Sequence, residues 1–211
     1  MSSVWKLAAL AGGSALFCVA AYKYMKLFEK EYIDETNAIN DVLIFMKDEE
    51  REENAYLDCD KIKYILNNAR STVDVCMAKL TSTLIIHCLT MVADRGVKVR
   101  LVIHSDCSEE DMECHREILD SGGERIIIDP KERLDHEIIL VDAHGVAKNP
   151  AALVGALSSC YGESNEFYDS TLITSEYKIV SVLQEEFNRL WDMLIDATNR
   201  KGANSSSTHR R

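Results

Sequence analysis

The residues best suited to chemistry lie in one short polar stretch. Asp135, His136 and Glu137 are consecutive, and Asp142 and His144 follow them. Side chains alternate along an extended strand, so Asp135 and Glu137 share one side and His136 faces the other. Carboxylates and imidazoles suit Mg²⁺ or Mn²⁺, and one candidate ligand set is Asp135, Glu137, Asp142 and His144. The alternative is a polar strand end at the surface without a site, because carboxylate clusters are more often solvated than metal-bound.

The charge balance narrows the functions that the chain supports. Its 211 residues include 24 Lys and Arg against 35 Asp and Glu, a formal net charge of −11. Nucleic acid affinity comes largely from Lys and Arg side chains that neutralise phosphates. The acidic balance therefore argues against a dominant phosphate-binding surface, although a local basic groove stays open.

Common catalytic motifs are absent from the sequence. It has no glycine-rich phosphate loop, no Cys-x-x-Cys pair and no nucleophile elbow. Six residues separate Cys107 from the Cys114-His115 pair, a spacing that zinc sites do not favour. We therefore expect structural cysteines there and no bound cofactor.

The elements around the polar stretch alternate between strands and helices. Expected strands cover 41–46, 72–77, 97–103, 125–128, 137–142 and 172–174. Expected helices cover 61–69, 81–94, 109–120 and 175–197. Alternation at this spacing predicts an α/β sandwich, with a largely parallel or mixed sheet flanked by helices.

The N-terminal region carries a membrane signal. An uncharged run from Leu7 to Tyr22, flanked by Lys6 and Lys23, predicts one N-terminal transmembrane helix. The alternative is a cleaved secretory signal with its cleavage site near Ala21. We expect an uncleaved anchor that faces a reducing compartment.

The remaining cysteines and the C-terminal tail complete the domain plan. Six cysteines follow the apolar run, and they are Cys59, Cys76, Cys88, Cys107, Cys114 and Cys160. They are spread through apolar segments, which favours reduced, buried thiols over a disulfide framework.

We expect an anchor over 1–32, a folded domain over 33–199 and a disordered polar tail over 200–211.

Two segments carry a family resemblance. Residues 71–107 (STVDVCMAKLTSTLIIHCLTMVADRGVKVRLVIHSDC) resemble the first strand–helix–strand unit of the phospholipase D superfamily. Residues 182–194 (VLQEEFNRLWDML) are similar to its last helix. The chain most resembles the small mitochondrial members, the cardiolipin hydrolases also called Zucchini endoribonucleases, over about residues 40–197.

This resemblance implies a location and an activity. It implies a phospholipase D-like sandwich on the outer mitochondrial membrane, with the domain in the cytosol. It also implies a dimer whose active site forms across the interface. The family hydrolyses a lipid or RNA phosphodiester, and this activity is tied to germline small RNAs.

The family's catalytic signature is altered in this chain. The signature is a histidine, a lysine two residues later and an aspartate five residues further on. Anchored on Asp142, the histidine position holds Asp135 and the lysine position holds Glu137. In the family the histidine attacks phosphorus and the lysine offsets phosphoryl charge, whereas two carboxylates would repel a phosphate. His136 is one residue out of register, and only a bulge could re-aim it.

Later family positions are altered as well. In the family, a glycine–serine pair and then an asparagine follow the signature. The corresponding residues here are Gly155, Ala156 in place of the serine and Ser158 in place of the asparagine. A later acidic position of the family corresponds to Asp169. The zinc-binding insert of many relatives is missing, which leaves Cys59 without the other ligands.

We therefore expect a catalytically degenerate, membrane-anchored protein. Its expected role is a binding, scaffold or dimerisation partner, with itself or with an active relative, in piRNA biogenesis or mitochondrial lipid signalling. The alternative is an active phosphodiesterase that hydrolyses cardiolipin or single-stranded RNA through His136 or a metal-dependent site.

Overall fold

A computed structural model describes most of the domain. The described residues are 39–46, 52–104, 109–129, 134, 136–144, 150–157 and 168–207. They fall within one compact unit that spans Ala38–Arg211. Within these ranges no helix combines the length and the apolar character needed to cross a membrane. The expected span from Leu7 to Tyr22 lies outside the described residues, and so does Asp135.

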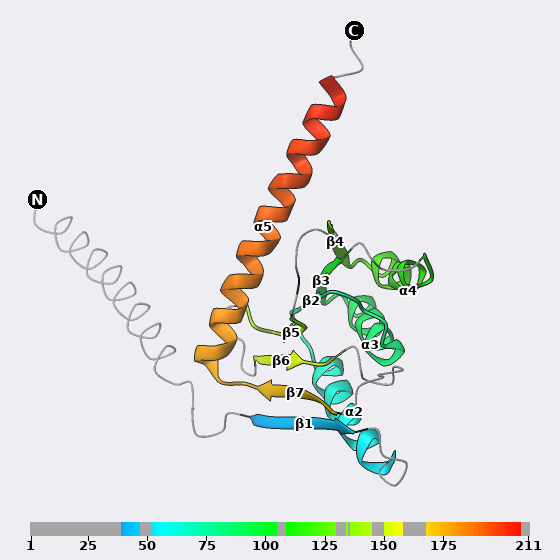
Figure 1. Cartoon of the computed structure of the whole chain (residues 1–211), viewed down its shortest axis with the longest axis vertical. Helices are drawn as coiled ribbons and strands as arrows, with labels where there is room; N and C mark the ends of the chain where they lie inside the picture. Colours follow the sequence, from blue (N-terminus) through cyan, green and yellow to red (C-terminus); the bar gives the residue numbers. More distant parts are fainter. Residues whose placement is uncertain are drawn as a thin grey trace, which may run out of the picture. The chain divides into compact units, whose positions relative to one another are not determined.

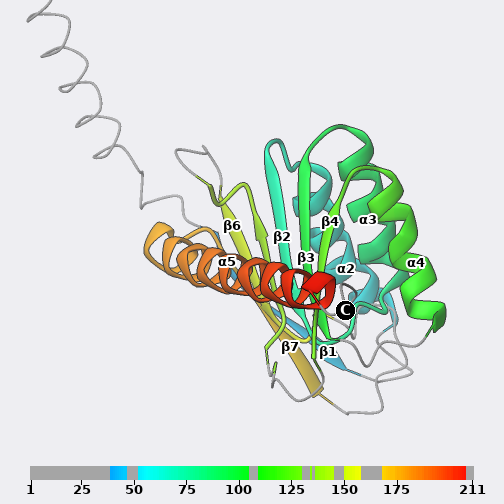
Figure 2. The ribbon, with the colours of Figure 1, turned by 90° about the horizontal axis from the view of Figure 1, so that it is seen from above.

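Seven strands form one mixed sheet in the order β1-β7-β6-β5-β2-β3-β4 (Figure 2). The strands are β1 Asn40–Met46, β2 Thr72–Met77, β3 Lys98–His104, β4 Glu124–Ile128, β5 Ile138–Val141, β6 Ala151–Gly155 and β7 Tyr168–Thr174. Strands β2, β3 and β4 run parallel. Every other neighbouring pair is antiparallel. The expectation of a mixed sheet is confirmed.

Helices cover both faces of this sheet. Helices α2 (Glu52–Asn67), α3 (Thr83–Asp94) and α4 (Glu109–Asp120) pack on one face, and α5 (Tyr177–Ser207) crosses the other (Figures 1 and 2). Alternation along β2 serves both layers: Val73, Val75 and Met77 join the core under α2–α4, whereas Cys76 joins the core under α5. The fold is therefore the expected α/β sandwich.

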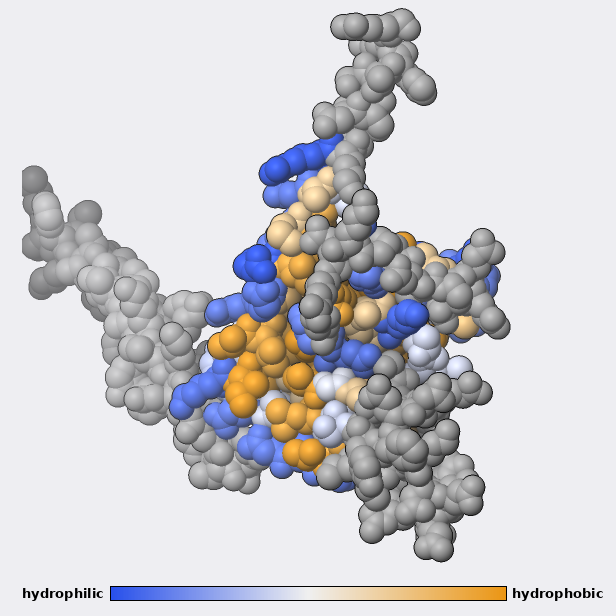
Figure 3. All heavy atoms as spheres, viewed as in Figure 1, coloured by the Kyte–Doolittle hydropathy of each residue, from blue (hydrophilic) through white to orange (hydrophobic). Residues whose placement is uncertain are grey.

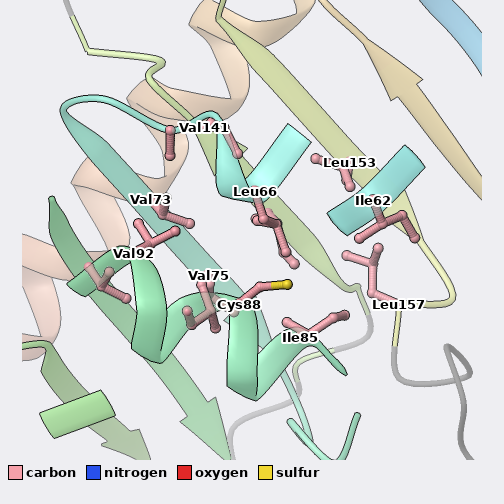
Figure 4. Close-up of a cluster of buried hydrophobic side chains, with 14 of the residues drawn as sticks. Ile62, Leu66, Val73, Val75, Ile85, Cys88, Val92, Val141, Leu153 and Leu157 are labelled. Carbon is pink, nitrogen blue, oxygen red and sulfur yellow. The ribbon is translucent and has the colours of Figure 1, made fainter. Parts of the chain in front are cut away.

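The core beneath α2 and α3 explains why these segments are helical. Ile85, Cys88 and Val92 of α3 are spaced three or four residues apart, and all three point toward the sheet (Figure 4). Ser82 caps the helix, because its hydroxyl accepts a hydrogen bond from the Ile85 N–H at 3.4 Å. Gly96 lies just past the helix end with a φ of +82°, a conformation that glycine adopts without strain. The predicted bounds of this helix are confirmed.

Four elements differ clearly from the sequence prediction. Helix α2 begins at Glu52 instead of residue 61. Strand β6 was not expected, because its sequence AALVG lacks the alternation of a half-buried strand; its pairing with β5 and β7 forms it. Strand β7 begins at Tyr168 instead of residue 172. Helix α5 continues to Ser207, so the predicted disordered tail from residue 200 is wrong for 200–207. Extending an existing helix costs less than starting one, which allows it to run on through small polar residues.

Three of the four cysteines that the structure describes follow the prediction. Cys59, Cys76 and Cys88 are buried thiols outside any disulfide, whereas the thiol of Cys114 is exposed on α4. Cys107 and Cys160 lie outside the described residues. Burial, with a smaller contribution from the charge of Glu186, raises the pKa of the Cys76 thiol to about 12. This thiol is therefore protonated and unreactive near neutral pH.

Candidate functional site at the two ends of strand β5

Glu137 lies immediately before β5, beside the end of β6. Its backbone carbonyl accepts a hydrogen bond from the Gly155 N–H at 3.0 Å. Its carboxylate oxygen Oε2 accepts one from the Leu157 N–H at 2.5 Å. A free backbone N–H at such a position could bind an anion, but here the chain's own carboxylate occupies it. Glu137, which the sequence analysis aligned with the lysine of the signature, is thus already hydrogen-bonded.

Gly155 fixes the backbone that presents this N–H. Its φ is +132°, a region that is nearly closed to residues with a side chain. A Cβ added there would also collide with the carbonyl oxygen of Ser170 on β7. Leu157, two residues later, is buried and points into the core under α2 and α3 (Figure 4). The glycine is therefore required by the close approach of β6 to β7.

His136 faces away from the Glu137 carboxylate. His136 is exposed, and its positive charge contributes to a lowered pKa of Glu186 on α5, although the hydrogen bonds from Arg189 contribute most. Glu137 instead contacts Leu157 on the opposite side of the sheet. The alternation predicted for these two residues is therefore observed, with no bulge that turns His136 toward Glu137.

Asp142, at the other end of β5, has a different role. Its carboxylate accepts hydrogen bonds from the backbone N–H groups of Arg70, Ser71 and Thr72 at 2.7–3.1 Å, and from the Ser71 hydroxyl at 2.8 Å. Its own N–H donates to the Thr72 carbonyl at 2.8 Å. Asp142 has a φ of 50°, which aspartate tolerates better than most residues. It ties the start of β2 to the end of β5.

The hydrogen bonds around Asp142 also set its ionisation. Burial raises the pKa of this carboxyl and is the largest single influence. The hydrogen bonds from Ser71, Thr72 and Arg70 together outweigh burial, so the pKa is lowered overall. Asp142 is therefore a charged structural group, and its contacts are with backbone donors.

A second polar cluster lies beneath α5, and the sequence analysis missed it. Asp74 on β2 and Arg100 on β3 are register partners, and their side chains are 0% and 8% exposed. Arg100 Nε donates to Asp74 Oδ1 at 2.7 Å, and Nη2 donates to Oδ2 at 2.6 Å. This is a bidentate buried ion pair.

Helix α5 and His144 complete this cluster. Gln184 Nε2 donates to Asp74 Oδ2 at 2.8 Å, and Arg100 Nη2 donates to Asn188 Oδ1 at 3.0 Å. Arg100 Nη2 also lies 2.7 Å from His144 Nε2. The same His144 nitrogen lies 3.2 Å from Asp74 Oδ2, so it adjoins both members of the ion pair, and the tautomer decides whether it accepts from Arg100 or donates to Asp74. The polar contacts join the sheet to α5.

Aromatic side chains cover the same guanidinium. The Arg100 Cζ atom lies 4.8 Å from the ring centre of Phe187 and 5.2 Å from that of Trp191. These cation–π contacts and the ion pair hold one turn of α5 against β2 and β3. The sequence did carry a signal: Asp74 lies between two valines in β2, and Arg100, of opposite charge, lies between Val99 and Leu101 in β3.

The candidate metal ligands do not come together. Glu137 and Asp142 stand at opposite ends of β5, about 16 Å apart along an extended chain. Asp142 contacts backbone groups of residues 70–72, and His144 contacts Arg100. In the described part of the chain no three His, Cys, Asp or Glu side chains form a group that could hold a metal ion. The metal hypothesis is therefore wrong for Glu137, Asp142 and His144, and Asp135 lies outside the described residues.

The sequence matches a known family over most of the fold just described. Residues 62–191 match the family described as "Cardiolipin synthase, PLD-like domain". This chain belongs to that PLD-like family. The match runs from α2 to Trp191 of α5 and so includes both ends of β5. Among the curated proteins, no sequence matches this chain.

Several solved structures share this fold. NucT from Helicobacter pylori aligns with a TM-score of 0.56 and 14% identity, over 74% of this chain and 97% of that one. The phospholipase D family member Nuc from Salmonella typhimurium aligns with a TM-score of 0.56 and 15% identity, over 73% and 95%. Polyphosphate kinase from Porphyromonas gingivalis aligns with a TM-score of 0.56 and 17% identity, over 75% and 26%. The PLD-like fold is therefore confirmed.

Proposed function

We propose that this PLD-like domain has lost phosphodiesterase activity and acts as a binding, scaffold or dimerisation partner. In this proposal it is a diverged member of the Zucchini or cardiolipin hydrolase subfamily, anchored to the outer mitochondrial membrane by residues 1–32. It would contribute there to piRNA biogenesis or mitochondrial lipid signalling, as a homodimer or paired with an active relative.

The hydrogen bond from the Leu157 N–H to Glu137 carries the proposal. A phosphodiester needs positive charge and free donors around its phosphoryl oxygens. At the lysine position this domain offers a carboxylate that already uses a backbone donor. Asp135 at the histidine position would add a second negative charge. A phosphate would meet repulsion where an active relative supplies attraction.

The pattern of lost and kept signature residues also supports the proposal. The one signature residue that is kept, Asp142, is bound to the backbone of residues 70–72. Selection for the fold alone accounts for this aspartate. A histidine and a lysine whose only task is chemistry can be replaced without loss of structure.

The decisive experiment is an activity assay with an engineered reversion. The purified full chain would be tested on single-stranded RNA and on cardiolipin, with and without Mg²⁺ or Mn²⁺. The reversion combines Asp135→His with Glu137→Lys, and the matched control is Glu137→Gln, which removes the charge but supplies no lysine. We expect no turnover from the natural chain or the control. Activity gained by the reversion would confirm the register of the signature.

Two results would contradict the proposal. Turnover by the natural chain that His136→Ala abolishes would make the protein an enzyme with a rearranged site. Metal-stimulated turnover that His136→Ala leaves intact would make it a metal-dependent phosphodiesterase. The partner role has a separate test, which is co-purification with an active relative; a strict homodimer would contradict pairing with that relative.

A further inference from the structure

Two histidines lie in one row at the edge of the sheet, on its α5 face. His104 ends β3 and follows Val102, a residue of the core under α5, by two positions. Its N–H donates to the Ala78 carbonyl at 3.1 Å, so Ala78 is its neighbour across the sheet. The register of β2 with β5, continued by two residues, places Ala78 opposite His136 as well. We call His104, Ala78 and His136 the histidine row.

The histidine row differs from the next row of the same face. Figure 3 shows hydrophobic residues over the N-terminal half of α5 and the strands beside it, bordered by hydrophilic residues. In the histidine row, by contrast, His136 is exposed and His104 is half-buried, so both imidazoles reach solvent. The next row is apolar throughout and consists of Ile126, Val102, Cys76, Ile138, Val154, Leu172 and Val42.

The spacing of the two imidazoles suits one small anion. Neighbouring strands lie about 4.8 Å apart, so the backbones of His104 and His136 are about 10 Å apart across Ala78. A tetrahedral oxyanion that accepts hydrogen bonds on two of its oxygens needs the two donor atoms about 5–8 Å apart. Imidazoles that lean toward each other over Ala78 reach this separation. The methyl group of Ala78 is too short to fill the space between them.

Helix α5 borders the histidine row without covering it. Gln184 of α5 contacts Asp74 on β2, and Ala78 lies four residues beyond Asp74, about 13 Å along the strand. An α-helix with its side chains has a radius of about 5–6 Å, so α5 does not extend over Ala78. The positive charge of His136 does act on Glu186, which places α5 at one side of the row.

The fixed charges around the row nearly balance. Both carboxylate oxygens of Glu186 accept hydrogen bonds from Arg189, at 2.6 and 2.8 Å, so its charge is already paired. Lys79 past the end of β2 and Asp129 past the end of β4 carry opposite charges at the same edge of the sheet. The carboxylate of Glu137 contacts Leu157 on the other side of the sheet. Protonated imidazoles would therefore make the row locally positive.

We propose that His104 and His136, when protonated, bind the phosphate group of a phosphomonoester between them, above Ala78. A dianionic phosphate balances two imidazolium charges and accepts a charge-assisted hydrogen bond from each. Imidazole side chains change charge between about pH 5 and 8, so binding should weaken as the pH rises. The site goes beyond the proposed function, since it lies opposite Glu137 and requires no catalytic step.

NMR of ¹³C-labelled histidine side chains observes both imidazoles directly. The full chain, in detergent, is titrated with glycerol 3-phosphate at about pH 6.5 and constant ionic strength. We expect the resonances of His104 and His136 to move together with a single dissociation constant, at least tenfold weaker at about pH 8.5. His87, exposed on α3 in the opposite layer, is the matched control, and its resonance should not move.

Two variants test whether the ligand lies between the histidines. Ala78→Leu keeps both imidazoles but fills the space between them, and His104→Gln removes one of the two charges. In each variant we expect at least tenfold weaker binding, measured at His136. His87→Gln should leave binding unchanged, and denaturant unfolding of all three variants shows that they are folded.

Two further ligands distinguish the source of the phosphate group. Dihexanoyl phosphatidate carries it on a lipid and adenosine 5′-monophosphate carries it on a nucleotide, so the tighter ligand identifies the source. Equal shifts at His87, or full binding by Ala78→Leu, would overturn the proposal in favour of general charge screening. Phosphodiesterase turnover by the natural chain would contradict the proposed function and leave this site untouched.

Discussion

The two ends of β5 hold their polar residues in different ways. At the carboxyl end, Asp142 accepts hydrogen bonds from three consecutive backbone N–H groups, and His144 adjoins the buried pair under α5. At the amino end, His136 is exposed, and Glu137 bonds to the turn after β6. The first end holds the sheet together, and the second carries the residues on which the proposed loss of activity rests.

This difference teaches that a polar residue at a strand end can be retained for the fold alone. Asp142 stabilises the fold whether or not a phosphate is ever bound. The carboxylate of Glu137 contacts one backbone donor, so it places a weaker demand on the fold. Measurements of the free energy of unfolding can test this difference between the two ends of β5 without any substrate.

The largest stability loss is expected at the buried pair on the structural side. Arg100→Met leaves the Asp74 carboxylate buried without its partner, and we expect a loss of about 3–5 kcal/mol in the free energy of unfolding. Arg189→Met is the matched control, since its ion pair with Glu186 is exposed to solvent and contributes little to stability. Denaturant unfolding of both variants measures the difference. Equal losses would show that Asp74 is not held in a buried environment.

The next largest effect is expected at the carboxyl end of β5. Asp142→Asn keeps the side-chain shape but places an amide NH₂ against backbone donors, and we expect a loss of about 2–3 kcal/mol at neutral pH. The native pKa of Asp142 is lowered, so its stabilisation is complete above the unfolded value of about 4 and fades as the pH falls through the native pKa. Unfolding measured across pH should show the penalty shrinking in acid. A penalty independent of pH would contradict the role of the charge.

A smaller loss is expected at the turn that presents the Leu157 N–H. Gly155→Ala adds a Cβ against the Ser170 carbonyl at a φ of +132°, and we expect a loss of about 1–3 kcal/mol. Gly96→Ala is the control, because that glycine also has a positive φ but open space around the added atom. Thermal unfolding should rank Gly155→Ala as the more damaging change. The reverse order would mean that β6 can move away from β7 at little cost.

The smallest effect is expected at the amino end. Glu137→Gln keeps an oxygen that can accept the hydrogen bond from Leu157 and removes only the charge, so we expect a change of about 1 kcal/mol or less. Denaturant unfolding of Glu137→Gln and of Asp142→Asn, measured in parallel, compares the two ends of β5 directly. A loss at Glu137 as large as that at Asp142 would remove the distinction between them.

Local elements of this protein could be predicted from the sequence because neighbours within four residues determine them. The spacing of Ile85, Cys88 and Val92 predicts α3, Thr81 or Ser82 predicts its start, and the apolar run 72–77 predicts β2. The structure selects Ser82 as the cap. The alternation that separates His136 from Glu137 follows from strand geometry alone.

Contacts between distant segments could not be predicted in the same way. Strand β6 forms because β5 and β7 flank it, and its own five residues carry little strand preference. Asp142 meets residues 70–72 only because β5 pairs with β2, and Asp74 meets Arg100 only because β2 pairs with β3 in that register. The sequence by itself determined most of the helices and strands, because their signals are local. Only the tertiary structure decided which polar groups are structural, because a buried charge is stabilised by partners that the strand order brings to it from far along the chain.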